Sequence, residues 1–288
     1  MTTMTVTSRA TALGRQVLQA LLDEVTLTPK PGLVDLRSRG AHVDLNWALM
    51  CHSACVLQPV FAAMAGAGER MDDDDLLRQR IGALGRDGES VMMAATGGVN
   101  THRGAIWALG LLVTAAAQQV ARGGSLAPQD VAARAGALAR LQDHGAPQET
   151  GNKGELACRQ YHVGGARGQA RADFPHVTQI GLPALRASRA RGDSETTARL
   201  NSLLAIIAQL DDTCVLSRGG VAALTALQAG AARVLAAGGA GTQAGTQALL
   251  ALEAEVLALN VSPGGAADLL AATLFLDRLE KGELHGKA

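Results

Sequence analysis

The sequence predicts an all-α fold, and two observations support that prediction. Apolar residues recur every three or four positions in many segments, a period that places them on one face of a helix. No segment shows the alternating β-branched or aromatic residues that are typical of a strand. The chain has 288 residues, enough to bury a core without a partner. We therefore expect a single compact multi-helix domain over residues 1–288, with residues 1–10 flexible.

The expected helices are placed by this period and by the residues that end it. The first carries apolar residues from Leu13 to Val25 and stops at residues 28–32, where two prolines and a glycine cannot continue a helix. The apolar face at residues 200–210 fits either the core or the seam of a homodimer. The same spacing predicts the other helices over residues 50–64, 75–95, 105–121, 128–141, 200–210, 219–236, 246–260 and 263–281.

Two segments fall outside the expected helices. Residues 143–193 contain many glycines and three prolines, and a structureless segment of this length is usually functional, so we predict a loop-rich insert there. Its basic residues Arg159, Arg167 and Arg171 fit either a lid over an anionic substrate or a solvated, disordered loop. Residues 238–245 are expected to form a flexible turn.

Charge and composition argue against nucleic acid and membranes as partners. Lys plus Arg and Asp plus Glu both number 26, so no net field attracts the chain to a polyanion. Aromatic residues make up 2%, which leaves few stacking platforms for single-stranded nucleic acid. The most apolar stretches, such as residues 105–120, are too short and too interrupted to span a bilayer.

The first residues and the cysteines favour a cytoplasmic protein. Residues 1–12 show neither a basic start followed by an apolar run nor a small-residue cleavage site. The four cysteines form no CxxC pair and no dense framework, so we interpret them as buried thiols in a reducing compartment.

Polar residues concentrate in four breaks between the expected helices. The first break, residues 28–44, holds Lys30 between two prolines, followed by Asp35, His42 and Asp44. A lysine can neutralise phosphate oxygens, and carboxylates can hold a Mg²⁺ that bridges them. The alternative is a plain helix-ending turn in which Asp44 caps the next helix.

The second break, residues 97–104, leads directly into an expected helix. Backbone N–H groups at that helix start, together with Arg103, would favour a phosphate. His102 can donate or accept a proton near neutral pH. The alternative is an ordinary helix cap provided by Asn100 or Thr101.

The third break, residues 211–220, places Asp212 and Arg218 between two strongly apolar helices. Charged groups at an interior junction are costly unless they are paired or bound to a ligand. The two residues therefore indicate either a ligand site or a structural salt bridge between them.

The fourth break begins at Ser262, which is expected to cap a helix whose first residue is Pro263. Gly264 and Gly265 leave this helix start open to a close ligand, and Asp268 lies about one turn inside it. The alternative for Asp268 is a surface charge that complements the helix dipole. Neither GxxxxGK[ST] nor GxGxxG occurs in a usable context, so any nucleotide must be held by an unrelated helical site.

Taken together, segments of these breaks resemble one family over nearly the whole chain, from Thr28 to Leu279: TPKPGLVD with GAHVD, GVNTHRGAIWALG, DDTCVLSRGG and SPGGAADLLAATLFL. They are similar to the triphosphoribosyl-dephospho-CoA synthases. The resemblance implies a transferase that takes ATP and 3′-dephospho-CoA, releases adenine and makes 2′-(5″-triphosphoribosyl)-3′-dephospho-CoA. That product is the prosthetic-group precursor for an acyl carrier protein of malonate decarboxylase or citrate lyase. The Asp-Asp-Thr-Cys form of the third segment is more similar to the malonate decarboxylase branch.

The reaction that the resemblance implies assigns a role to most polar residues of the four breaks. The cations, amide and helix-start glycines expected to contact substrate are Lys30, Asn100, Arg103, Arg167, Arg218, Gly264 and Gly265. The carboxylates from which the ligands of Mg²⁺ are expected are Asp35, Asp44 and Asp268. The residues expected to transfer protons or orient ribose hydroxyls are His42, His102 and Asp212.

Two positions depart from the family pattern. Arg103 stands where a lysine is usual, which keeps the charge but changes the donor geometry. Gln169 stands where a glutamate is expected, so any acid, base or metal-binding role of that glutamate is absent or carried out differently here.

Two other functions remain open on the residues alone. The first is an all-helical metal-dependent phosphohydrolase, although none of the seven histidines is followed directly by the aspartate that such sites usually show. The second is a non-catalytic helical protein that presents dephospho-CoA to an assembly partner. Release of free adenine, release of phosphate, or binding without turnover separates the three.

Overall fold

A computed structural model gives the fold and describes residues 7–147 and 149–282. This part of the chain contains helices and no strand, so the all-α prediction is confirmed. The expectation of a flexible start is wrong for residues 8–10, because the first helix already begins at Ser8 and the Thr7 hydroxyl accepts the N–H of Ala10 as its cap. Residues 1–6 lie outside the described part.

The helices follow one another with short connections. In chain order they are α1 (Ser8–Thr26), α2 (Trp47–Arg70), α3 (Asp74–Ala95), α4 (Arg103–Ala121), α5 (Pro128–Arg140), α6 (Lys153–Tyr161), α7 (Gly165–Arg171), the π-helical turn η1 (His176–Gly181), α8 (Leu182–Ala190), α9 (Glu195–Ile207), α10 (Thr213–Ala236), α11 (Gln243–Ala258) and α12 (Gly264–Glu280).

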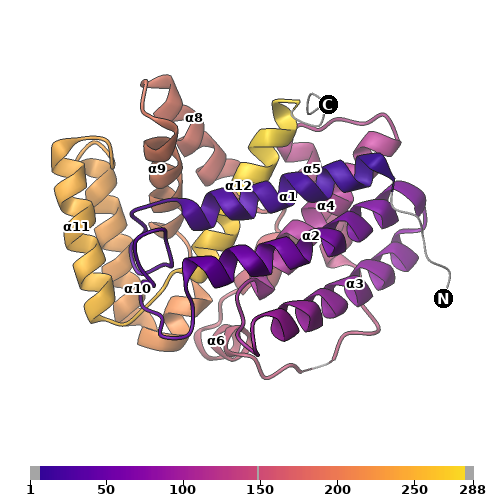
Figure 1. The fold of residues 1–288 in the computed structure, drawn as a ribbon, viewed down its shortest axis with the longest axis horizontal. Coiled ribbons are helices and arrows are strands. Elements are labelled where there is room, and N and C mark those ends of the chain that lie inside the picture. The colour runs from indigo at the N-terminus through magenta and orange to yellow at the C-terminus, as the bar shows by residue number, and fades with distance from the viewer. Residues whose placement is uncertain (1–6, 148, 283–288) are drawn as a thin grey trace.

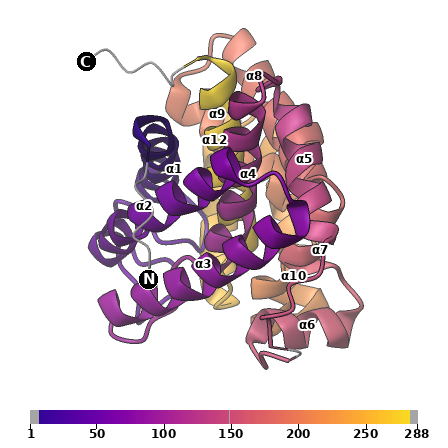
Figure 2. The same ribbon diagram turned by 90° about the vertical axis from the view of Figure 1, so that its right-hand side faces the viewer.

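Two helices far apart in sequence form the centre of the molecule. Figure 2 shows α4 and α12 between α1, α2 and α3 on one side and α5 and α7 on the other, and Figure 1 shows the α10–α11 hairpin at one end. Every residue of α4 from 108 to 118 is buried. The apolar faces of the surrounding helices therefore pack on a core whose two central helices both begin at sequence breaks rich in polar residues.

The predicted loop-rich insert at residues 143–193 is wrong, because this segment folds into α6, α7, η1 and α8. Each of these elements is short, so its apolar period is too brief to read in sequence. Several of its glycines, including Gly151, Gly165 and Gly192, adopt positive φ at helix boundaries rather than forming flexible chain. Phe174 is completely buried and anchors the segment to the core.

The helix α10 is broken near its start. Gly220 has φ 65° and ψ −165°, a conformation that is open almost only to glycine. It separates a leading segment, residues 213–219, from the main part of the helix, which pairs with α11. The sequence period beginning at residue 219 corresponds to this main part.

Within residues 7–147 and 149–282, three helices are long and apolar enough to cross a membrane by length and composition, namely α2, α4 and α10. The sequence argument that residues 105–120 are too short for a span is therefore wrong. In α4, 72% of the apolar window is buried inside the protein, against 39% in α2 and 33% in α10. Burial in the core accounts for the composition of α4.

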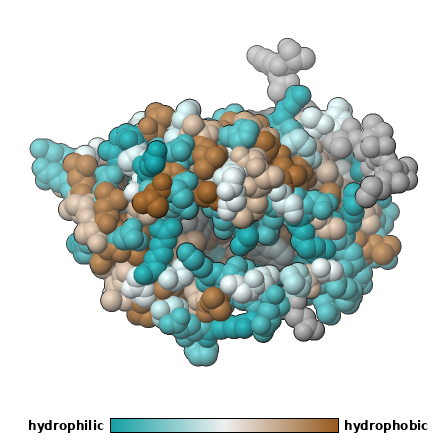
Figure 3. All heavy atoms as spheres, turned by 60° about the horizontal axis from the view of Figure 1, so that its bottom comes forward, coloured by the Kyte–Doolittle hydropathy of each residue, from teal (hydrophilic) through white to brown (hydrophobic). Residues whose placement is uncertain are grey.

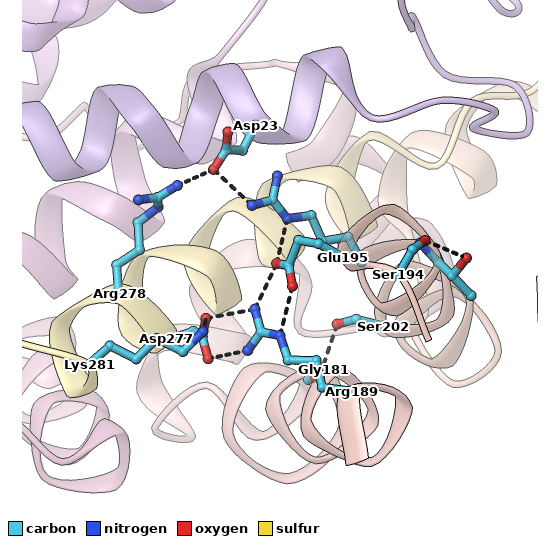
Figure 4. Close-up of polar contacts among 11 residues, drawn as sticks. Asp23, Gly181, Arg189, Ser194, Glu195, Ser202, Asp277, Arg278 and Lys281 are labelled. Carbon is cyan, nitrogen blue, oxygen red and sulfur yellow. Dashed lines mark hydrogen bonds and ion pairs between the residues drawn. The ribbon is translucent and has the colours of Figure 1, made fainter. Parts of the chain in front are cut away.

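The apolar face at residues 200–210 belongs to the core, since Leu200, Leu203, Leu204, Ile207 and Leu210 are all buried. A network of ion pairs joins the helices around α9 (Figure 4). Its members include the pairs Arg189–Glu195, Arg189–Asp277, Asp23–Arg199 and Asp23–Arg278, which join α1, α8, α9 and α12.

Candidate active site

The four polar breaks predicted from the sequence meet in space. They are the connection between α1 and α2, the loop before α4, the start of α10 and the start of α12. The face that carries the lower ends of α6 and α10 in Figure 1 is hollowed at its centre when it is turned forward in Figure 3. The contacts below show which side chains hold these breaks together.

His42 joins the first, third and fourth breaks. Its Nε2 lies 3.0 Å from Ser262 Oγ, and its Nδ1 lies 3.3 Å from Nη2 of Arg218, which also donates to the Ala41 carbonyl at 3.0 Å. Because a guanidinium only donates, Nδ1 is the acceptor and Nε2 carries the hydrogen that is donated to Ser262. Burial, then the charge of Arg218, lowers the pKa of His42, with Asp44 opposing, so the ring is neutral at neutral pH.

Asp212 fixes the starts of α10 and α12 relative to each other. Its two carboxylate oxygens accept the N–H groups of Cys214 at 2.8 Å and Ala266 at 2.9 Å. Burial raises the pKa of Asp212, while these backbone N–H groups act in the opposite direction. The structural salt bridge considered for Asp212 and Arg218 is therefore not the arrangement found, since each residue has other partners.

The start of α12 differs in detail from the sequence expectation. The helix begins at Gly264 with Pro263 as its cap residue, and the Ser262 hydroxyl contacts His42 instead of capping the helix. A Cβ on Gly265 would lie 3.1 Å from the Asp212 carboxylate, and one on Gly264 would lie 3.1 Å from Cys214 Sγ. Glycine at these positions thus lets the helix start approach the side chains of α10 closely.

Asp268 lies against the start of α4. A Cβ on Gly104 would come within 2.0 Å of Oδ2 of Asp268, and the backbone N–H of Ala105 donates to the carboxylate. Burial raises the pKa of Asp268 well above its ordinary value, and the charges of Glu24 and Asp212 raise it further. No cationic side chain of the described residues pairs with it, so this half-buried carboxylate is electrostatically unsatisfied.

His102 lies beneath the same helix start and is 2% exposed. Its Nδ1 is 2.9 Å from Ser53 Oγ, which is itself 2.6 Å from the Thr101 hydroxyl. Its Nε2 is buried and has no hydrogen-bond partner among the residues that the structure describes. Burial, then the charge of Lys30, lowers the pKa of His102 to about 4, so the ring is neutral at neutral pH. Ser53 lies inside α2 without any sequence motif, and sequence reasoning missed it.

Lys30 is buried, and its charge is already paired within the protein. Only 1% of it is exposed, and its Nζ donates to the Glu24 carbonyl at 2.7 Å and pairs with the Glu24 carboxylate. Glu24 is another residue that the sequence did not single out, because it reads as an ordinary polar residue near the end of a helix.

Asp35 organises its own loop. It accepts hydrogen bonds from the Thr28 hydroxyl at 2.7 Å and from the backbone N–H groups of Lys30, Arg37 and Ser38 at 3.1, 2.8 and 2.8 Å. Burial alone would raise the pKa of Asp35, but these hydrogen bonds outweigh it and lower the pKa. The carboxylate oxygens of Asp35 are therefore already engaged in hydrogen bonds within its own loop.

Asp44 remains on the surface, with 57% of its side chain exposed and its Oδ1 3.7 Å from His42 Nδ1. It does not cap the next helix as the alternative proposed, because Asn46 accepts the N–H of Leu49 and takes that position. In the described ranges, no three His, Cys, Asp or Glu side chains gather as a metal cluster. Asp35, Asp44 and Asp268 therefore lie in three separate environments.

The predicted cations differ in whether a carboxylate already neutralises them. Arg103 pairs with Glu89 at 2.9 Å, and its backbone N–H donates to Asn100 Oδ1 at 3.2 Å, although the cap residue of α4 is His102 and not Asn100 or Thr101. Arg218 and Arg167 have no carboxylate partner within residues 7–147 and 149–282. These two arginines are thus the ones available to an anionic ligand.

Gln169 and two of the cysteines lie in settings that the sequence did not predict. Gln169 Oε1 lies 3.0 Å from His176 Nδ1, a contact that an amide oxygen makes by accepting. The interpretation of the cysteines as buried thiols is wrong for Cys55 and Cys214, which are exposed. Cys214 lies on the leading segment of α10, next to the start of α12.

Comparison with known proteins assigns the chain to a family. A family model for ATP:dephospho-CoA triphosphoribosyl transferase matches residues 10–286. The chain belongs to this family. It is therefore an enzyme of the transferase class, and all four breaks lie inside the matched span of the triphosphoribosyl transferase family.

Relatives in the family are similar over nearly their full length. The 2-(5''-triphosphoribosyl)-3'-dephosphocoenzyme-A synthase of Klebsiella pneumoniae is 57% identical over 272 residues, which cover 94% of this chain and 96% of that protein. Proteins named probable synthases of the same kind are 57% identical in Azotobacter vinelandii, over 91% of this chain and 89% of theirs, and 53% identical in Pseudomonas syringae, over 95% and 93%. No solved structure matches the chain.

Proposed function

We propose that this member of the triphosphoribosyl transferase family makes 2′-(5″-triphosphoribosyl)-3′-dephospho-CoA from ATP and 3′-dephospho-CoA. The 2′-hydroxyl of dephospho-CoA attacks the anomeric carbon of the ATP ribose, and the bond from that carbon to adenine breaks. The proton of the hydroxyl passes to a base, and adenine leaves with a proton of its own. The observation that supports this function best is the unsatisfied carboxylate of Asp268, which belongs to the fourth family segment and lies beside Gly104 of the second and Asp212 of the third.

The charge of Asp268 suits a transition state that resembles an oxocarbenium ion and a substrate that arrives with Mg²⁺. Magnesium in nucleotide sites usually binds one or two protein carboxylates together with substrate phosphates, so it needs no cluster of three acidic residues. Of the three predicted ligands, Asp35 is used within its loop and Asp44 is on the surface, whereas Asp268 has no cation beside it. Asp268 therefore fits the metal, which when bound would neutralise charge on the triphosphate.

The other roles follow from which polar atoms are free. Arg218 binds the triphosphate through its guanidinium, whose hydrogen-bond partners among the described residues are the Ala41 carbonyl and His42. His102 hydrogen-bonds the reacting part of the substrate through its unused Nε2, and Ser53 holds the ring in place. Asp212 holds the starts of α10 and α12 together, and His42 holds the first break against Ser262.

The Asp-Asp-Thr-Cys form of the third segment supports the acyl carrier protein of malonate decarboxylase as the destination of the product. A strain that lacks this gene and carries both carrier proteins tests the choice. We expect the malonate decarboxylase carrier to lose its prosthetic group, and loss from the citrate lyase carrier alone would contradict it.

The reaction itself is tested with purified protein, ATP, Mg²⁺ and 3′-dephospho-CoA, followed by chromatography with mass detection. We expect adenine release that depends on dephospho-CoA, and a product heavier by the triphosphoribosyl group. Phosphate release without adenine would instead identify a phosphohydrolase. Binding of dephospho-CoA without any turnover would identify a non-catalytic carrier.

Replacement of Arg218 by glutamine is expected to raise the KM for ATP about tenfold or more, because a charge-assisted contact to phosphate contributes about 1.5–3 kcal/mol. Steady-state kinetics with each substrate varied in turn measure this. Arg233→Gln on the same helix is the matched control, since Arg233 pairs with Glu255 at the surface. An unchanged KM for ATP in the Arg218 variant would remove Arg218 from the triphosphate site.

Replacement of His102 by alanine is expected to lower kcat about 100-fold, the range usual for loss of a group that assists proton transfer. His102→Gln keeps a hydrogen-bonding side chain and should retain more activity than alanine. Because the pKa of His102 is lowered to about 4, the neutral ring and its contribution are present at neutral pH and disappear as the pH falls through about 4. Near-normal turnover of the alanine variant at every pH would exclude this role.

A further inference from the structure

A second group of charges lies outside the contacts described above, where α3, α4 and α7 meet. Arg78 on α3 is 5% exposed, and its guanidinium carbon lies 5.3 Å from the centre of the Trp107 ring on α4. The indole N–H of Trp107 donates to the Ala166 carbonyl at 3.2 Å, which fastens α7 to the edge of the same ring. Arg78 thus lies on the face of an aromatic ring whose edge is bonded to a short helix that carries further arginines.

Charge is unbalanced at this point. Burial lowers the pKa of Arg78, the charge of Asp143 opposes this, and the nearby charges of Arg86, Arg167 and Arg171 lower the pKa further. Their one carboxylate partner in the described residues is Asp143, which lies 2.6 Å from Arg86 and 3.6 Å from Arg78. The side chains of Arg167 and Arg171, four residues apart on α7, have no partner there.

One buried donor is also unused. The Nε of Arg78 is buried and has no hydrogen-bond partner within the described ranges. A buried guanidinium N–H without an acceptor is costly, and a bound anion would satisfy it. Net positive charge, an unused buried donor and two unpaired arginines are the features of a phosphate site.

From these contacts we propose that Arg78, Arg167 and Arg171 form the subsite for the diphosphate of 3′-dephospho-CoA. This inference rests on the proposed function, which supplies two polyphosphate substrates to one site. The ATP triphosphate carries Mg²⁺ and belongs beside Asp268, whereas the arginine cluster has no free carboxylate for a metal and suits an anion that binds guanidinium groups directly. Trp107 is one helical turn beyond Gly104, so the subsite adjoins the reaction centre. This is required because the diphosphate and the attacking 2′-hydroxyl are carried by the same ribose.

Direct binding provides the test, with 3′-dephospho-CoA titrated by calorimetry into the full chain without ATP or Mg²⁺. We expect Arg167→Gln and Arg171→Gln each to weaken binding about tenfold or more and to leave the KM for ATP within about twofold. Inorganic pyrophosphate should compete with dephospho-CoA in the wild type and lose most of that competition in the variants. Arg140→Gln is the matched control, because Arg140 contacts the carbonyl of Arg171 but already pairs with Asp173.

Arg78 is tested by the conservative change to lysine, which keeps the charge and removes the Nε–H, with the thermal unfolding curve recorded beside the titration. A folded Arg78→Lys variant that binds dephospho-CoA more weakly supports the proposal. Unchanged dephospho-CoA binding in the Arg167 and Arg171 variants, or a rise in the KM for ATP instead, would overturn it. Weakened binding in these variants with no adenine release by the wild type would overturn the proposed function and leave the anion subsite standing.

Discussion

Asp268→Asn is expected to lower kcat by at least about 100-fold while making the protein more stable at neutral pH. The loss of activity follows from removing the charged carboxylate that the site offers to Mg²⁺ and to the developing positive charge, since even indirect supports of a metal site typically contribute 10–100-fold. The amide keeps an oxygen that can accept the Ala105 N–H, so the start of α4 retains its contact. Turnover and the free energy of unfolding should therefore move in opposite directions.

The sign of the stability change follows from the raised pKa of Asp268. A carboxyl whose pKa is raised on folding stabilises the protein fully below its unfolded pKa, and this stabilisation is lost as the pH rises through the folded pKa. At neutral pH the wild type has therefore lost stability through the ionisation of Asp268, whereas the amide of the variant does not ionise and the variant loses none. Denaturant unfolding of both proteins across pH should show two curves that diverge as the pH increases.

Two controls make the result specific. Asp44→Asn, which alters an exposed carboxylate, should leave turnover and its dependence on Mg²⁺ close to normal. In the wild type, kcat/KM should rise with pH through the raised pKa of Asp268, and this rise should be absent from Asp268→Asn. Normal turnover of the Asp268 variant, or a large loss in the Asp44 variant, would assign the metal to a different carboxylate.

Lys30→Ala is expected to destabilise the protein by about 3–5 kcal/mol, because it leaves the buried Glu24 carboxylate without its cation. Removal of one member of a buried pair exposes the other to the full cost of desolvation. If Lys30 instead bound the triphosphate, the same change would raise the KM for ATP and leave the unfolding transition in place. Chemical denaturation and steady-state kinetics on one preparation distinguish the two.

A double variant sharpens the interpretation. Replacing the pair together, as Glu24→Gln with Lys30→Met, removes both charges and should recover much of the stability lost in Lys30→Ala. Recovery of stability and turnover would show that the pair supports the fold. Recovery of stability with a KM for ATP that stays high would return Lys30 to the substrate site.

The fold class was accessible from sequence because long helices carry their apolar period in full. The exact start of a helix is harder to predict, as α12 shows. The helix begins one residue later than expected, and for that reason the Ser262 hydroxyl contacts His42 instead of capping the helix. The short elements α6 to α8 were missed for a related reason. They are stabilised by packing, as the burial of Phe174 shows, and not by a period that a window of the sequence can reveal.

The candidate site was predictable as a set of segments but not as a set of roles. Residue type identified Lys30 and Asp35 as ligands, yet both are used inside the protein, by Glu24 and by the loop around Thr28. The role of such a residue depends on its burial and on its hydrogen-bond partners, and the local sequence predicts neither. Arg78 illustrates the converse, because it reads as a surface arginine of an amphipathic helix and is in fact buried against Trp107.

The break at Gly220 has a consequence for how this architecture can diverge. Asp212 and Arg218 belong to the region before the break, and Asp212 is held to α12 through the N–H of Ala266. The long part of α10 beyond the break pairs with α11, and Glu253 of α11 pairs with Arg37 in the first break. The connection between the two helices is bonded to α9, where Asn201 accepts the N–H of Ala240. A relative that changes the length of the α10–α11 hairpin must therefore change the first break and α9 as well, whereas the short segment before Gly220 can keep its place beside α12.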